Sequence, residues 1–114
     1  GYKYGLPLDS DLVFDTRFLP NPFYIDQLRN LNGKSRKVQE FVMKSAETAE
    51  YLHSLKSFID GQLAGFMKEG KSTLTISIGC TGGKHRSVVI AEDLKNYFRQ
   101  KKLEVKIIHR DIYK

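Results

Sequence analysis

The stretch Gly79-Cys80-Thr81-Gly82-Gly83-Lys84-His85-Arg86-Ser87 holds the residue types best suited to chemistry in this chain of 114 residues. Glycines allow successive backbone N–H groups to point into one concavity, and a helix that starts here adds the positive end of its dipole. A plain tight turn would explain the glycines. It would not explain three consecutive basic residue types at a helix end that repels cations. The pattern predicts a loop that binds phosphate or another anion, with Arg86 able to hold two oxygens at once.

Two known loop patterns compete for this stretch. A Walker A motif needs four residues between its glycines and Ser or Thr after the Lys. Here only three residues separate Gly79 from Gly83, and a His follows Lys84, so no ATPase site is predicted.

The second pattern, Cys80-x5-Arg86-Ser87, is similar to the loop of cysteine-dependent phosphatases, in which a thiolate attacks phosphorus and an Arg holds the oxygens. That chemistry needs a general acid, and Asp15 is the candidate. Gly79 stands where that family usually has His. A phosphatase that uses Cys80, Arg86 and Asp15 is therefore the enzymatic alternative.

The hydrophobic pattern predicts the elements that position this loop. An apolar run at 12–14 predicts a buried strand that becomes polar at Asp15, and the prolines of Pro20-Asn21-Pro22 stop it. Spacings of three and four over residues 35–69 predict one long helix or two, because residues 45–48 are a weak stretch. Gly70 is the expected stop.

The remaining elements alternate in type. Residues 74–78 predict a strand, Ser87 is a candidate cap for a helix that runs to about Lys101, and residues 104–109 predict a last strand. Residues 2–4 are also expected to end a short strand, which Gly5 and Pro7 then break. This order predicts a small three-layer α/β domain with a mostly parallel sheet of about four strands and helical crossovers. Ligands bind beyond the carboxyl ends of such strands, where residues 15–21 and 80–87 both fall.

Composition and charge narrow the function further. The formal net charge is +6. Residues 84–114 carry nine basic and four acidic side chains, whereas residues 1–83 carry ten basic and nine acidic side chains. A positive field in the C-terminal quarter is typical of a surface that attracts phosphate on a metabolite or on nucleic acid. A solvated helix face with a soluble tail is the simpler interpretation.

Absent features exclude several classes of protein. The single cysteine, Cys80, excludes a disulfide framework and a multi-cysteine zinc site, so we expect no metal and no cofactor in this domain. No run approaches the roughly 20 apolar residues of a membrane helix, and no signal peptide is seen, so we expect a cytoplasmic protein with no membrane partner. Because the chain begins with Gly1 rather than Met, we expect a fragment of a longer protein.

Several strings occur in an order that resembles the C-terminal domain of the RapZ/YvcJ family of bacterial nucleotide-binding proteins. They are Gly-Leu-Pro at 5–7, Phe-Asp-Thr-Arg-Phe-Leu-Pro-Asn-Pro at 14–22, the loop at 79–87, and His109-Arg110. The resemblance covers nearly all of the chain and implies a single domain over residues 1–114. Full-length members place a P-loop domain before this one, so any NTPase activity would belong to that domain, which this chain lacks.

The same resemblance implies a regulatory function without catalysis. In the RapZ branch this domain binds small RNA, presents it to an RNA-cleaving enzyme, senses glucosamine-6-phosphate and assembles as an oligomer. The YvcJ branch has a less secure RNA role. Carried onto this chain, the ligand and phosphate residues are Cys80, Thr81, Gly82, Gly83, Lys84, His85, Arg86 and Ser87, together with Asp15, Arg17 and Asn21. The last three would close the pocket and read amine or hydroxyl groups, although a buried Asp15–Arg17 pair that orients the loop is the alternative.

The expected RNA contacts are basic residues of the C-terminal quarter. They are Lys84, Arg86, Arg99, Lys101, Lys102, Lys106, His109, Arg110 and Lys114. Few aromatic residues lie among them, so this surface predicts backbone or shape recognition rather than base stacking. RNA binding without any metabolite is a third hypothesis. Because Lys84 to Arg86 belong to both expected sites, RNA and phosphosugar are expected to compete.

Overall fold

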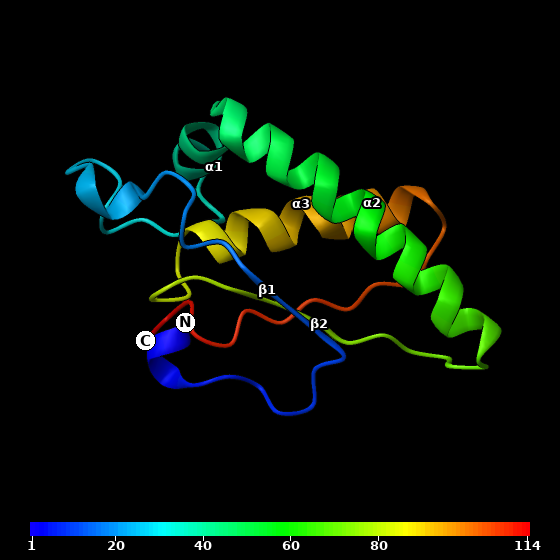
Figure 1. Ribbon diagram of the computed structural model, residues 1–114. Helices are drawn as coiled ribbons and strands as arrows, with labels where there is room; N and C mark the ends of the chain where they lie inside the picture. The colour runs from blue at the N-terminus through cyan, green and yellow to red at the C-terminus, as the bar shows by residue number, and fades with distance from the viewer.

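Two short parallel strands and three helices make up the computed structural model, which describes residues 1–114 (Figure 1). The elements are a 3-10 helix η1 (Tyr2–Tyr4), strand β1 (Leu12–Asp15), a 3-10 helix η2 (Pro22–Tyr24), helices α1 (Arg36–Met43) and α2 (Ala46–Lys68), strand β2 (Ile76–Gly79) and helix α3 (Arg86–Gln100). No helix is long and apolar enough to cross a membrane.

The strand register brings the two polar segments together. Leu12 pairs with Ile76, and Asp15 pairs with Gly79, so both strands end at the same edge. Thr16 strengthens this junction, because its amide and its hydroxyl both donate to the Gly79 carbonyl at 2.8 Å. The structure thus confirms that residues 15–21 and 80–87 start from adjacent carboxyl ends.

The core lies where α2 and α3 pack over the strands. Its buried residues are Leu19, Leu52, Leu55, Ile59, Ile90, Leu94 and Phe98. Phe14 and Ile78, which are neighbours in the register, pack against this cluster. Val13 lies on the opposite face of β1 and is 44% exposed. The helices therefore cover one face of the sheet.

The α/β class and the parallel pairing are confirmed, but two strands form rather than about four. Residues 2–4 form a 3-10 turn that Gly5 ends at φ 88°. Residues 104–109 alternate in burial as a strand would, yet their backbone groups make no hydrogen bonds with other backbone groups. A cleft of about 1010 Å³ is lined by both this segment and β2, and the two do not pair.

The helix predictions need smaller corrections. The stretch 35–69 forms two helices, with the break at Lys44 and Ser45 beside the predicted weak stretch. Gly70 follows α2 at φ 81°, which confirms it as the stop. Helix α3 begins at Arg86 with His85 as the residue before it, so Ser87 lies inside the first turn and is not the cap.

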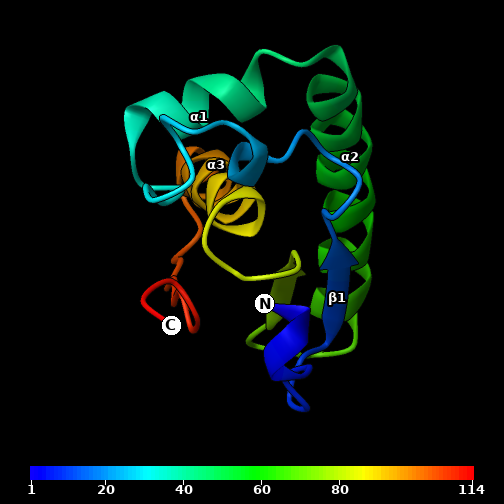
Figure 2. The same ribbon diagram turned by 90° about the vertical axis from the view of Figure 1, so that its left-hand side faces the viewer.

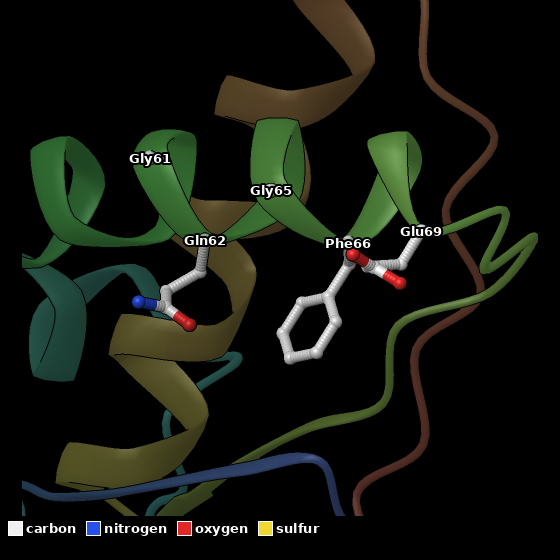
Figure 3. Close-up of a pocket in the computed structure, with 5 residues that line it drawn as sticks. All are labelled: Gly61, Gln62, Gly65, Phe66 and Glu69. Carbon is white, nitrogen blue, oxygen red and sulfur yellow. The ribbon is translucent and has the colours of Figure 1, made fainter.

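A small hollow of about 220 Å³ marks the exposed side of α2 (Figure 3). It exists because Gly61 and Gly65, one turn apart, carry no side chains between the projecting Gln62 and Phe66. No group of metal-binding side chains gathers there or elsewhere in residues 1–114. We assign no ligand to this hollow.

Candidate anion-binding site at the start of helix α3

The loop between β2 and α3 is organised around the Cys80 sulfur. Cys80 is 2% exposed, the Gly83 amide donates to its Sγ at 3.3 Å, and its thiol donates to Ser87 Oγ at 3.3 Å. Burial alone would raise the pKa of the Cys80 thiol, but the hydrogen bonds of Ser87 and Gly83 bring that pKa below its ordinary value. Gly83 needs its lack of a side chain here, because its φ is 77°.

Four backbone amides of this loop are free to bind a ligand. The N–H groups of Thr81, Gly82, Lys84 and His85 donate to no acceptor within the protein. They lie where a strand ends and a helix of 15 residues begins, so the helix dipole adds to their positive potential. The arrangement suits a phosphate or carboxylate group.

Arg86 brings a full charge to the same place. The residue is 5% exposed, its Nη1 donates to the carbonyls of Arg17 and Leu19, and its Nε has no partner. No carboxylate forms an ion pair with it. A buried guanidinium without a counter-ion costs free energy, which an anionic ligand would recover. Arg86 therefore joins the two polar segments and leaves a charge for a ligand to neutralise.

Asp15 and Arg17 form a pair at the mouth of the site. Arg17 Nη2 donates to Asp15 Oδ2 at 2.7 Å, and its Nε lies 3.0 Å from both carboxylate oxygens. Their side chains are 42% and 53% exposed, so the pair is not the buried one considered from the sequence. Hydrogen bonds from Arg17 hold the pKa of Asp15 below its usual range. A carboxyl group that stays ionised is a poor general acid, which weakens the phosphatase alternative.

Other predicted ligand residues have structural partners. The Asn21 side chain accepts from the Phe23 amide at 3.1 Å, so its oxygen caps η2. His85 Nε2 lies 2.6 Å from the Leu31 carbonyl, and burial lowers the pKa of His85. The neutral ring therefore donates to Leu31. Lys84 forms no ion pair and is partly exposed.

Residues far away in the sequence support this site, and the sequence did not predict them. The Gly33 amide donates to the Lys84 carbonyl at 2.7 Å, and the Tyr51 hydroxyl donates to the Asp15 carbonyl at 3.0 Å. The Tyr2 ring lies 4.4 Å from the Arg17 guanidinium. Contacts between residues so far apart in the chain leave no local signal in the sequence.

The predicted RNA contacts do not form one surface. Arg99, Lys101 and Lys102 lie at the C-terminal end of α3, about 21 Å from Lys84 and Arg86 by the rise of the helix. Several of the nine have acidic partners: Lys101 pairs with Asp60, His109 with Glu92, and Arg110 and Lys114 with Asp111. Arg99 donates to the Val105 carbonyl. Lys102 and Lys106 are exposed and form no ion pair.

Fold and site together define an α/β domain with a candidate anion-binding loop at a helix N-terminus. The chain belongs to the RapZ C-terminal domain family, whose model matches residues 1–113. It is 54% identical over 114 residues to a nucleotide-binding protein of Geotalea daltonii and covers 40% of that protein. It is 55% identical over 112 residues, 98% of this chain, to one of Caldanaerobacter subterraneus, of which it covers 39%. The chain thus spans about two fifths of the length of these relatives.

Titration of the Tyr51 hydroxyl should make the stability of the domain depend on pH in the alkaline range. Burial, together with the nearby charge of Asp15, raises the pKa of Tyr51 from 10.0 to about 12. Between these values the unfolded chain has lost a proton that the folded chain keeps, so the free energy of unfolding falls as pH rises. Tyr51→Phe should remove this part of the loss while the core contacts of the ring remain. Urea unfolding at pH 9, 10 and 11 tests this. An equal decline in both proteins would contradict it.

Proposed function

We propose that this chain is a regulatory domain that binds a phosphorylated amino sugar, of the glucosamine-6-phosphate type, in the loop from Cys80 to Ser87. The observation that carries the proposal is the unpaired charge of Arg86 beside free loop amides. A buried cation and unpartnered N–H groups at a helix N-terminus provide both the charge and the directed donors that a phosphate needs.

The amino sugar is favoured by the groups at the mouth of the site. The exposed Asp15 carboxylate stays ionised next to Arg17 and lies close enough to Arg86 for that charge to lower its pKa further. An ammonium group on the sugar would find Asp15 as its counter-ion, and Arg17 would donate to hydroxyl oxygens. Membership of the RapZ C-terminal domain family supports the same ligand.

The second half of the proposal is RNA binding. It rests on the net charge of +6 and on the family resemblance. We propose that the domain belongs to a cytoplasmic oligomer that binds small RNA and passes it to an RNA-cleaving enzyme, and that the phosphosugar regulates this step. The curated relatives bear the name nucleotide-binding protein, and the part of them outside the aligned region would carry that activity.

Titration calorimetry tests the metabolite half. Glucosamine-6-phosphate should bind saturably, glucosamine should bind far more weakly because it lacks the phosphate, and glucose-6-phosphate should lose the contact with Asp15. Equal binding of glucosamine and its phosphate would refute the proposed role of the loop.

Cys80→Ser separates a sensor from a phosphatase. The Cys80 thiol is buried and hydrogen-bonded to Ser87, so the serine hydroxyl should preserve the loop and change the affinity for glucosamine-6-phosphate by less than about threefold. Neither protein should release phosphate from p-nitrophenyl phosphate. Turnover by the wild type that the variant lacks would establish the phosphatase instead.

A further inference from the structure

We propose that Phe18, Phe23 and Tyr24 form a stacking surface for unpaired bases of single-stranded RNA, an inference that rests on the proposed RNA binding. These three side chains are 55%, 52% and 76% exposed within seven consecutive positions. Exposed apolar residues that are gathered in one patch, rather than scattered singly, mark interaction sites. Every base has a π-face, so exposed rings bind unpaired bases without requiring a sequence.

The rings are held in place before any ligand arrives. Phe23 and Tyr24 meet edge to face with centroids 5.7 Å apart, and Asn21 caps the short helix that carries both. Phe18 packs edge to face against Tyr51 at 5.0 Å. Rigid rings lose little conformational entropy when a base stacks on them.

Positive charge lies near these rings, where Arg29 also pairs with the exposed Asp26 at 2.8 Å. The Arg29 guanidinium lies 5.3 Å from the Phe23 ring centroid, and Arg29 Nε donates to the Phe23 carbonyl at 2.7 Å. Residues 29–44 contain five basic side chains and one acidic side chain. Helix α1, which begins in this stretch, lies against η2. This local excess lies within residues 1–83, whose ten basic and nine acidic side chains nearly balance.

The exposed lysines and arginine of this stretch complete the surface. Lys34 and Lys37 form no ion pairs. Arg36 pairs with Glu40, but both of these side chains are highly exposed. Such a pair contributes little and yields easily to a phosphate. Cations next to aromatic rings match the alternation of phosphate and base along a single strand. This charge favours RNA over an apolar protein partner.

The surface is also joined to the anion-binding loop. The two carbonyls that accept from Arg86 belong to the residues on either side of Phe18. The His85 ring donates to the Leu31 carbonyl, and the Lys84 carbonyl accepts from the Gly33 amide. Figure 2 looks along α3 from its N-terminal end, where η2, the turn and the loop gather. One strand of RNA can therefore place bases on the rings and phosphates near the loop.

Fluorescence anisotropy with three labelled RNA probes of equal length tests the proposal: a single strand, the same strand with abasic sites, and a duplex. The wild type should bind the single strand at least tenfold more tightly than either of the others. The Phe23→Leu, Tyr24→Leu double variant keeps apolar side chains but no rings. It should lose this preference while its affinity for the abasic strand stays the same.

A matched control is Phe58→Leu, because Phe58 is 51% exposed on α2 and lies outside this surface. This variant should bind all three probes as the wild type does. Unchanged binding of the single strand by the double variant would overturn the stacking surface while RNA binding stood. Failure of the wild type to bind any probe, while it still binds glucosamine-6-phosphate, would refute RNA binding and this inference with it.

Discussion

Arg86→Met should reduce the affinity for glucosamine-6-phosphate at least 100-fold. Arg86 supplies the only buried guanidinium at the site, and its Nε is buried without a hydrogen-bond partner. Removing a buried charged donor from a bound anion costs about 3 kcal/mol, which corresponds to more than a 100-fold change in Kd. Titration calorimetry measures the effect.

Stability should change much less than affinity in this variant. Methionine retains most of the apolar volume and removes a buried charge that lacks a counter-ion, while the carbonyls of Arg17 and Leu19 lose a donor. These opposing effects leave a loss of about 1–2 kcal/mol in the free energy of unfolding. Arg99→Met is the matched control, because Arg99 lies on the same helix and also donates to a carbonyl. Equal affinities for Arg86→Met and wild type would show that the loop is not the phosphate site.

Gly33→Ala should destabilise the domain by about 1–3 kcal/mol. A β-carbon at Gly33 would lie 2.6 Å from the His85 carbonyl oxygen and 2.6 Å from Val88 Cβ. The clash would push the turn away from α3 and lengthen the 2.7 Å hydrogen bond from Gly33 to Lys84. Because that bond holds the anion-binding loop, phosphosugar affinity should fall as well.

Gly61→Ala provides the control for this prediction. Gly61 lies within α2, and an added β-carbon there meets nothing within 4 Å, beside the hollow of Figure 3. Alanine in an exposed helix interior should raise the free energy of unfolding by up to about 1 kcal/mol and leave affinity unchanged. Urea unfolding of both variants measures the two effects. A Gly33 variant as stable as the wild type would contradict the close approach of the turn to α3.

The sequence was most informative where patterns were local. The strand–loop–helix order around residues 74–100 and the break before Ala46 follow from periodicity and from the glycine-rich loop. The joint position of Asp15 and Gly79 follows from the rule that parallel strands end at one edge. These features could be predicted without knowing which residues far apart in the chain are in contact.

Two features of the structure depend on partners that lie far away in the sequence. Residues 104–109 have the alternation of a strand, but a strand also needs a hydrogen-bonding neighbour, and this segment does not pair with β2, with which it lines the cleft. The basic residues of the C-terminal quarter have the composition of a nucleic-acid surface, but Lys101, Arg110 and Lys114 have acidic partners. Partners that come from distant parts of the chain are set by the tertiary fold.

The central claim is that the unpartnered amides of Thr81, Gly82, Lys84 and His85, together with the Arg86 guanidinium, hold a phosphate. Amide chemical shifts of the 15N-labelled chain during titration with glucosamine-6-phosphate test it most directly. The account predicts saturable shifts concentrated at Thr81 to Ser87, together with a shift of the Arg86 Nε signal, and none at Lys101 or Lys102. Saturable shifts confined to other residues, or no shifts at millimolar ligand, would contradict it.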